Sequence, residues 1–140
     1  MLNRQGWKFV ARDALALYVL SYLIRFALRA ILGLPEPPSA LAELSAGALV
    51  LLFGVLSFGV VSFYTRNEVW KHLVAVSAIL YVASAVKNVV SLSMQLPEFN
   101  LFLVITAITP PLIHYSLVAS IGGYLGLKLK HRRNDRRAAS

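Results

Sequence analysis

The feature that most constrains this chain is a set of four long apolar runs. They cover roughly Asp13 to Gly33, Leu44 to Tyr64, Val69 to Ser93 and Leu101 to Leu127. Each run has roughly 20 to 25 residues, and at 1.5 Å per residue a helix of that length crosses about 30 Å of hydrocarbon. None of the runs alternates between apolar and polar residues, as the strands of a membrane barrel do. The sequence therefore predicts an all-α membrane protein whose four transmembrane helices form a compact bundle.

The composition agrees with a membrane protein of one domain. Of the 140 residues, 58% are hydrophobic and only 14% are charged, whereas a soluble domain has about 25% charged residues. The chain contains no cysteine, which excludes a disulfide framework, a cysteine-based metal site and a thiol nucleophile. The segments outside the apolar runs are short, so we expect no soluble domain on either side of the membrane.

The distribution of charge predicts which side of a membrane each segment occupies. Lys and Arg gather in residues 1–12, in the connection between the second and third runs and in residues 128–140. The other two connections contain Glu36, Glu43 and Glu98 and no Lys or Arg. The positive-inside rule therefore places both termini in the cytoplasm, and we expect the membrane to be the cell membrane of a prokaryote. The net charge of +8 is then a topology signal, and we expect no specific nucleic-acid binding.

The two basic ends carry predictions of their own. Residues 1–12 interleave apolar side chains such as Trp7 with Arg4 and Lys8, which fits an interfacial amphipathic helix or a plain cytoplasmic arm. Residues 128–140 begin with KLKHRRNDRR and predict a cytoplasmic tail. Such a tail is attracted to anionic lipid by about 1 kcal/mol per basic residue.

Two of the runs carry polar residues at helical spacing. In the first run the polar positions are Tyr18, Tyr22, Arg25 and Arg29, and in the third they are Ser77, Tyr81, Ser84, Asn88 and Ser91, with Lys87 beside Asn88. Intervals of four and three residues form a stripe with the period of packed left-handed helix pairs. Because both runs cross in the same direction, we expect Arg25, Arg29 and Lys87 at a similar level in the outer half of the membrane.

These three cations need a partner, because no Asp or Glu lies inside any run beyond Asp13, the residue at which the first run begins. An unpaired charge at the bilayer centre costs about 2.5–3.5 kcal/mol on insertion scales. The candidates are the loop glutamates, helix carbonyls and tyrosine hydroxyls, a bound anion or lipid phosphate, and carboxylates of another chain. For Arg29 and Lys87, snorkelling toward the headgroups is the plainest arrangement. Arg25 lies one turn deeper, which favours a buried polar cluster or an interface with a partner.

The second run contains small residues that allow another helix to approach closely. They are Gly47, Gly54, Ser57 and Gly59. Close approach of this kind is the usual route to helix association in lipid. It favours packing within the chain's own bundle, with dimerisation as the alternative.

The fourth run contains two prolines and a histidine. Pro110 and Pro111 predict a kink, and they free backbone carbonyls that Thr106 or a water molecule could satisfy. His114 lies near the middle of the run and has no metal ligand at its depth. We expect it to form a hydrogen bond to a tyrosine of a neighbouring helix: Tyr18, Tyr22 or Tyr81.

Two function classes remain, and they share one set of candidate residues. The favoured class is a small integral membrane subunit or assembly protein that binds a partner chain or anionic lipid. The alternative is a homo-oligomeric channel or transporter for an anion or a small polar solute. The candidate site consists of Arg25, Arg29, Lys87, Asn88, Tyr22, Tyr81 and His114. No catalytic constellation is visible in the sequence, and we expect no cofactor.

Overall fold

The computed structural model describes residues 4–32, 40–65, 68–95 and 101–138, and in these residues the chain forms four α-helices. They are α1 (Arg4–Leu32), α2 (Ala40–Tyr64), α3 (Val69–Gln95) and α4 (Leu101–Ala138). Within the helices, the side chains of residues 4, 5, 29, 32, 40–46, 95, 137 and 138 are not described. The prediction of an all-α fold with four packed helices is confirmed.

Two of the helices extend beyond the apolar runs that predicted them. α1 begins at Arg4, so residues 4–12 are helical and continuous with the first run. α4 continues through the basic sequence as far as Ala138. The basic side chains in its last turns suit the negative end of the helix dipole.

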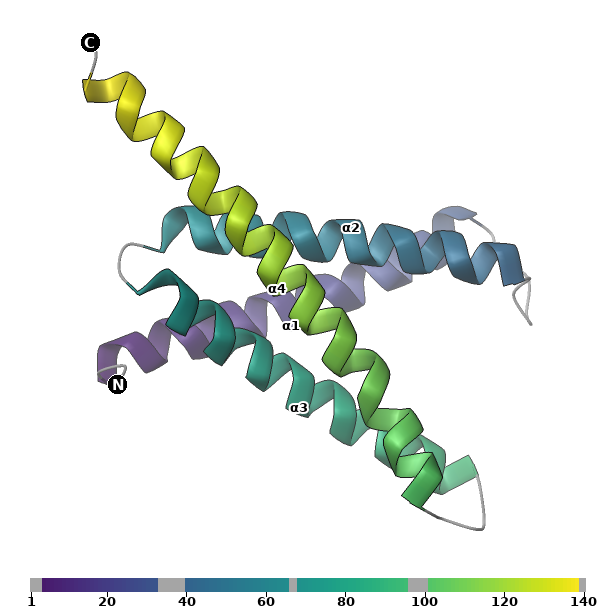
Figure 1. Cartoon of the computed structure of the whole chain (residues 1–140). Helices are drawn as coiled ribbons and strands as arrows, with labels where there is room; N and C mark the ends of the chain where they lie inside the picture. The colour runs from purple at the N-terminus through teal and green to yellow at the C-terminus, as the bar shows by residue number, and fades with distance from the viewer. Residues whose placement is uncertain (1–3, 33–39, 66–67, 96–100, 139–140) are drawn as a thin grey trace.

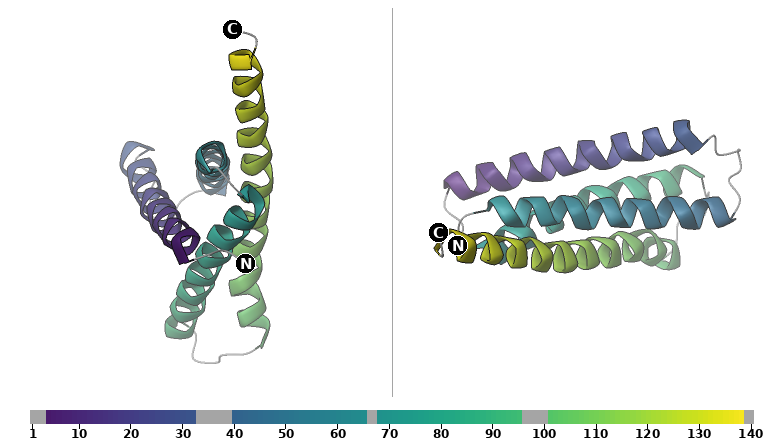
Figure 2. Two further views of the ribbon diagram at one scale, coloured as in Figure 1. Left: turned by 90° about the vertical axis from the view of Figure 1, so that its left-hand side faces the viewer. Right: turned by 90° about the horizontal axis from the view of Figure 1, so that it is seen from above.

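The helices run up and down along the bundle, and helices adjacent in sequence are antiparallel (Figure 1; Figure 2). One end of the bundle holds the start of α1, the end of α2, the start of α3 and the end of α4, and we call it the basic end. At the opposite end, the far end, α1 finishes and α4 begins. Figure 1 shows that α3 and the first part of α4 diverge from α1 and α2 toward the far end.

Among the described residues, three helices are long and apolar enough to cross a membrane. The qualifying segments are Gly47–Tyr64 in α2, Val69–Met94 in α3 and Leu101–Arg136 in α4. Large apolar side chains on their outer faces, such as Leu52, Val82 and Ile113, are more than half exposed in the isolated chain. A chain with three such helices is suited to a lipid environment, which covers apolar faces.

The buried core lies in the half of the bundle next to the basic end. Its members are Val10, Ala14, Val55, Phe58, Leu73, Val76, Leu80, Val118 and Ala119. Val10 and Ala14 belong to the first half of α1, and Leu17 and Tyr18 are partly buried against the core. Beyond Tyr18, none of the described side chains of α1 is buried. The core therefore holds α1 by its first half.

α2 and α4 approach each other most closely along Gly122 and Gly126 of α4, which with Gly123 we call the glycine seam. A Cβ atom on Gly122 would collide with the carbonyl oxygen of Val55, and one on Gly126 would collide with that of Gly59. The neighbouring Gly123 accepts a hydrogen bond of 2.9 Å from the buried Ser62 Oγ through its carbonyl oxygen. Because the colliding atoms belong to the backbone, only glycine fits at both contacts, and the seam fixes how α2 and α4 cross.

Two of the small residues singled out in α2 also pack within the chain. A Cβ atom on Gly54 would lie 2.9 Å from Val118 Cγ1, and one on Gly59 would lie 3.4 Å from the carbonyl oxygen of Gly122. A Cβ atom on Gly47 would meet nothing within 4 Å. Close packing inside the bundle thus accounts for Gly54 and Gly59 without a second copy of the chain.

Candidate functional site

A cavity of about 390 Å³ lies between α1, α3 and α4, and we call it the polar cavity. The residues lining it are Tyr18, Ser21, Tyr22 and Arg25 of α1, Ser84, Lys87 and Asn88 of α3, and Pro110, Pro111, His114 and Tyr115 of α4. All of them except Tyr18 and Tyr115, which pack against the core, lie beyond the part of their helix that enters it, so the cavity occupies the far half of the bundle. Small-molecule sites have volumes of about 300–1,000 Å³, which means that this cavity has room for more than a bare ion.

The polar cavity brings together most of the residues that the sequence singled out. Arg25, Tyr22, Lys87, Asn88 and His114 all line it. Tyr81 belongs to the same polar stripe of α3 but is not among the lining residues. The side chain of Arg29 lies outside the described part of the chain. The polar stripes of α1 and α3 therefore face a common space, with α4 as its third wall.

Among the described residues, the wall of the polar cavity carries two cations and no carboxylate. Arg25 and Lys87 line it, and none of the other lining residues is acidic. The ion pairs between described residues are Arg12 with Asp13, Lys71 with Glu68, and His72 with Asp13. Arg25 and Lys87 belong to none of these pairs. The carboxylates predicted to neutralise them, those of Glu36, Glu43 and Glu98, lie outside the described side chains.

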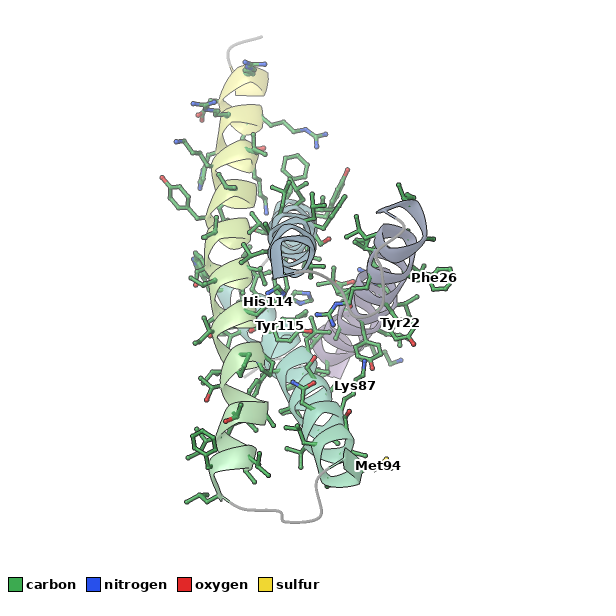
Figure 3. The ribbon with its side chains drawn as sticks, turned by 90° about the vertical axis from the view of Figure 1, so that its right-hand side faces the viewer. Tyr22, Phe26, Lys87, Met94, His114 and Tyr115 are labelled. Carbon is green, nitrogen blue, oxygen red and sulfur yellow. The ribbon has the colours of Figure 1, made fainter. Side chains whose placement is uncertain are left out.

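Lys87 has an aromatic neighbour across the polar cavity. Its Nζ atom lies 5.5 Å from the centroid of the Tyr22 ring, a cation–π contact between α3 and α1. Figure 3 shows Tyr22 and Lys87 beside the space into which His114 and Tyr115 point from α4, whereas Phe26 points away from it. A cation–π contact at an exposed site contributes about 0.5–1 kcal/mol, which offsets only part of the cost of a charge in lipid.

Asn88 has a structural task that the sequence did not reveal. Its Nδ2 atom donates a hydrogen bond of 3.1 Å to the carbonyl oxygen of Ala107. Pro111 lacks an N–H, and the carbonyl that it leaves without its usual helical partner is the one four residues earlier, that of Ala107. The sequence interpretation gave this task to Thr106 or water, but Thr106 Oγ1 donates to the carbonyl oxygen of Phe102 at 2.9 Å. Asn88 of α3 thus supplies the donor that Pro111 removes from α4.

The polar stripe of α3 is shared between two neighbouring helices. Ser84 Oγ and the hydroxyl of Tyr115 form a hydrogen bond of 3.0 Å, so Ser84 and Asn88 both bind α4. Lys87, between them, faces Tyr22 of α1. The stripe therefore contacts both α1 and α4, because α4 brings Pro111 and Tyr115 against the same face.

His114 lies where the polar cavity meets a second pocket. Its ring packs edge-on against Tyr115, with 5.2 Å between the ring centroids. A Cβ atom on Gly54 would lie 3.7 Å from His114 Nε2, so the missing side chain at Gly54 leaves room for the imidazole. Tyr18 and Tyr22 line the same cavity as His114, but among the described residues no hydrogen bond joins His114 to a tyrosine.

The second pocket is narrow, about 40 Å³, and lies between α1 and α2; we call it the apolar pocket. Its apolar walls are Leu17, Leu20, Ile24, Val50, Phe53, Phe58, Leu80 and Val118. Ser21, Arg25, His114 and Tyr115 line both the apolar pocket and the polar cavity. The two spaces therefore adjoin at Arg25 and His114.

Sequence reasoning missed the contacts that close the basic end. His72 Nε2 and Asp13 Oδ2 lie 2.9 Å apart and join α3 to α1, and His72 is only 5% exposed. Lys130 Nζ donates a hydrogen bond of 2.6 Å to the carbonyl oxygen of Thr65, directly after α2. Neither pair has a local signal, because the partners lie 59 and 65 residues apart in the chain. The GxxxG spacing of Gly122 and Gly126 could have revealed the glycine seam.

Comparisons of the chain with models of protein families, with curated proteins and with solved structures found no match. The functional argument therefore starts from the polar cavity, its two cations and the apolar pocket beside it. Within the described residues, no group of three or more His, Asp and Glu side chains is placed to hold a metal ion.

Proposed function

We propose that this protein is a small integral membrane protein that binds an anionic group, a phosphate or a carboxylate, in the polar cavity. The observation that carries the proposal is the pairing of Arg25 and Lys87 in one cavity, with no acidic residue among the described residues that line it. Arginine and lysine side chains supply several donors and a positive charge, which suits them to oxyanions. The proposal assigns no catalytic step and no cofactor to the chain.

Energetics in a membrane favour an occupied site. A charge at the bilayer centre costs about 2.5–3.5 kcal/mol on insertion scales, and a bound anion offsets that cost for both cations. Polar cavity walls help in the same way, since Ser21, Tyr18 and His114 offer further polar atoms to a ligand. An intramembrane ionisable residue is in general a candidate for a binding or transport role.

The proposal includes α1 as a fourth span. Its 29 residues have a length of about 43 Å at 1.5 Å per residue, more than the hydrocarbon thickness of about 30 Å. The positive-inside rule then orients the basic end toward the cytoplasm. In this orientation the polar cavity belongs to the outer half of the membrane, and the basic turns of α4 belong to the cytoplasmic surface, where they attract anionic lipid.

The binding proposal is compatible with a subunit or assembly protein, depending on the source of the anionic group. The anionic group that binds Arg25 and Lys87 comes either from a lipid or solute, or from a carboxylate side chain of a partner chain. The polar cavity favours the first source, because its walls come from α1, α3 and α4 of one chain and Asn88 and Ser84 already have partners in the same chain. Arg25 and Lys87 are exposed in the isolated chain, so the cavity is open to a ligand from the surrounding membrane.

Phosphate binding tests the proposal directly. Purified protein in a zwitterionic detergent is titrated with inorganic phosphate, and binding is followed by phosphorus NMR or calorimetry. We expect Arg25→Gln and Lys87→Gln each to weaken binding at least about tenfold, the loss of one charge-assisted contact of about 1.5 kcal/mol. Lys8→Gln, an exposed position on α1 near the basic end, is the matched control and leaves binding unchanged. Equal binding by wild type and both cavity variants would overturn the proposal.

A second candidate function is the passage of a small anion through the bundle. The observation in its favour is the division of the molecule into two halves. The polar cavity lies in one half, and the apolar core, with Leu80 and Val118, lies in the other. Conduction or transport would require that core to open. Protein reconstituted alone into liposomes distinguishes the two functions: a binding protein gives no anion flux, whereas a flux that Arg25→Ala abolishes would favour the transporter.

A further inference from the structure

The polar cavity and the apolar pocket together have the shape of a site for an amphiphile. The polar cavity contains the two cations, and the apolar pocket has side chains of Leu, Ile, Val and Phe as its walls. Arg25 lines both spaces, so this residue lies where a polar compartment meets an apolar one. A free anion would use only the first compartment.

The apolar pocket is accessible from the side of the bundle. Leu20 of α1 and Phe53 of α2 line it, and they are 42% and 39% exposed in the isolated chain. The core holds α1 through Val10 and Ala14, which lie in its first half. The opening between α1 and α2 thus faces the space that lipid chains would occupy around a spanning bundle.

We propose that the occupant of this site is a membrane lipid with an anionic phosphate headgroup, an inference that rests on the proposed function. The phosphate lies in the polar cavity against Arg25 and Lys87. The acyl chain leaves the bundle through the apolar pocket between α1 and α2. Charge complementarity selects the headgroup, and the apolar walls select a ligand that already resides in the membrane.

The two volumes fit this division. The polar cavity, at about 390 Å³, accepts a phosphate together with a glycerol backbone or a small headgroup, since a water molecule takes about 30 Å³ of liquid volume. The apolar pocket, at about 40 Å³, accepts a slender segment such as the methylenes next to the glycerol. The rest of the chain then continues into the bilayer beside α1 and α2.

A photoreactive lipid tests where the chain lies. The protein is reconstituted into phosphatidylcholine nanodiscs with a small fraction of phosphatidic acid that carries a diazirine near the glycerol end of one acyl chain. We expect labelling at Leu20, Ile24, Val50 and Phe53, reduced at least fivefold by Arg25→Gln and by excess unlabelled phosphatidic acid. A phosphatidylcholine with the same diazirine should label these four positions no more strongly than it labels the outer faces of the helices.

A pair of variants on α2 separates the chain from the headgroup. Val50→Trp fills the apolar pocket, and it should abolish labelling there while leaving the binding of inorganic phosphate unchanged. Leu52→Trp adds the same bulk two residues away, at a residue outside both spaces, and should change neither measurement. Retained phosphate binding also shows that the Val50→Trp protein is folded.

The outcomes distinguish this inference from the function on which it rests. If phosphate binding depends on Arg25 but lipid labelling is confined to the outer faces and insensitive to Val50→Trp, the ligand is a free anion and the lipid inference fails. If neither phosphate binding nor labelling depends on Arg25, the proposed function fails as well. Labelling in the apolar pocket that depends on both Arg25 and Val50 supports the inference.

Discussion

The two halves of the bundle are built on different principles. The half next to the basic end contains the apolar core, the glycine seam and the Asp13–His72 pair. The far half contains a cavity whose wall includes Arg25 and Lys87, two cations with no described carboxylate beside them. Both halves are made from the same helices, and α4 takes part in each.

The difference teaches how a chain of this size combines a stable fold with a binding site. Closely packed helices and satisfied polar groups stabilise one end, while under the proposed function the two cations at the other end serve ligand binding rather than stability. This division predicts that substitutions in the basic half destabilise the protein, whereas substitutions at the cavity cations affect ligand binding with little loss of stability. Four predictions test it, in order of expected effect.

The largest effect is expected at the glycine seam. In Gly122→Ala the new methyl collides with the carbonyl oxygen of Val55 and lies 2.8 Å from Phe58 Cβ, so α2 and α4 must separate. We expect the free energy of unfolding to fall by about 3 kcal/mol, the upper part of the usual range for overpacking. Thermal unfolding in detergent, with size-exclusion chromatography, measures the change.

Gly47→Ala is the matched control for the glycine seam. The same methyl at Gly47 meets nothing within 4 Å, and alanine in a helix is favoured over glycine by about 0.5–1 kcal/mol. The two substitutions should therefore change stability in opposite directions. If both variants were stabilised, the close contact between α2 and α4 would be refuted.

The next effect is expected at the Asp13–His72 pair. Asp13→Asn and His72→Gln each weaken a hydrogen-bonded contact between α1 and α3 in which His72 is 5% exposed. We expect each to lower the free energy of unfolding by about 1–3 kcal/mol, with the double variant costing less than the sum of the two. Chemical denaturation of the three variants gives the coupling between the residues.

Arg12→Gln serves as the control for that pair. Arg12 also binds the Asp13 carboxylate, at 2.7 Å, but its side chain is 67% exposed. An exposed ion pair contributes about 0–1 kcal/mol, so this variant should change stability less than either member of the buried pair. A larger loss from Arg12→Gln than from His72→Gln would contradict the assignment of the basic end as the tightly held half.

A smaller effect is expected where Asn88 binds Ala107. Asn88→Ala leaves the carbonyl oxygen of Ala107 without a donor and should cost about 1 kcal/mol. Pro111→Ala restores an N–H that reaches the same carbonyl along the helix. In the Pro111→Ala background, Asn88→Ala should therefore cost close to nothing. An unchanged cost in that background would show that Asn88 stabilises the protein through a different contact.

The smallest change in stability is expected from the cavity cations themselves. Arg25→Gln and Lys87→Gln remove charges that no described carboxylate neutralises. The free energy of unfolding should stay within about 0.5 kcal/mol of wild type or rise, as is common when a functional charge is removed. The same two substitutions are also made in a protein in which Glu36, Glu43 and Glu98 are all replaced by Gln. A fall in the free energy of unfolding of more than about 1 kcal/mol both in that background and in wild type would contradict this division.

The sequence was sufficient for the helices because their signal is local. Runs of apolar residues long enough for a membrane span leave few other structures, and α2, α3 and α4 each contain the predicted run. The periodic stripes also placed Tyr22 and Arg25 of α1 opposite Lys87 of α3, since a helix repeats every 3.6 residues. The two walls of the candidate site that α1 and α3 supply could therefore be deduced from the sequence.

The third wall of the site could not be deduced in this way. Its position depends on the angle at which α4 crosses its neighbours, and that angle is set by contacts of Gly122 and Gly126 with α2, outside the cavity. The angle decides that Pro111 faces Asn88, a pairing that no periodicity within one helix contains. The Asp13–His72 pair was missed for the same reason, since helix packing alone joins two residues so distant in sequence.

The glycine seam can form only late in the synthesis of the protein. The helices that pack most intimately, α2 and α4, are separated in the chain by α3. During synthesis α2 enters the membrane before its partner exists, and the carbonyl groups of Val55 and Gly59 meet Gly122 and Gly126 only when the last helix arrives. The bundle is thus completed by its final segment, and a chain interrupted before Gly122 would leave that face of α2 without its partner.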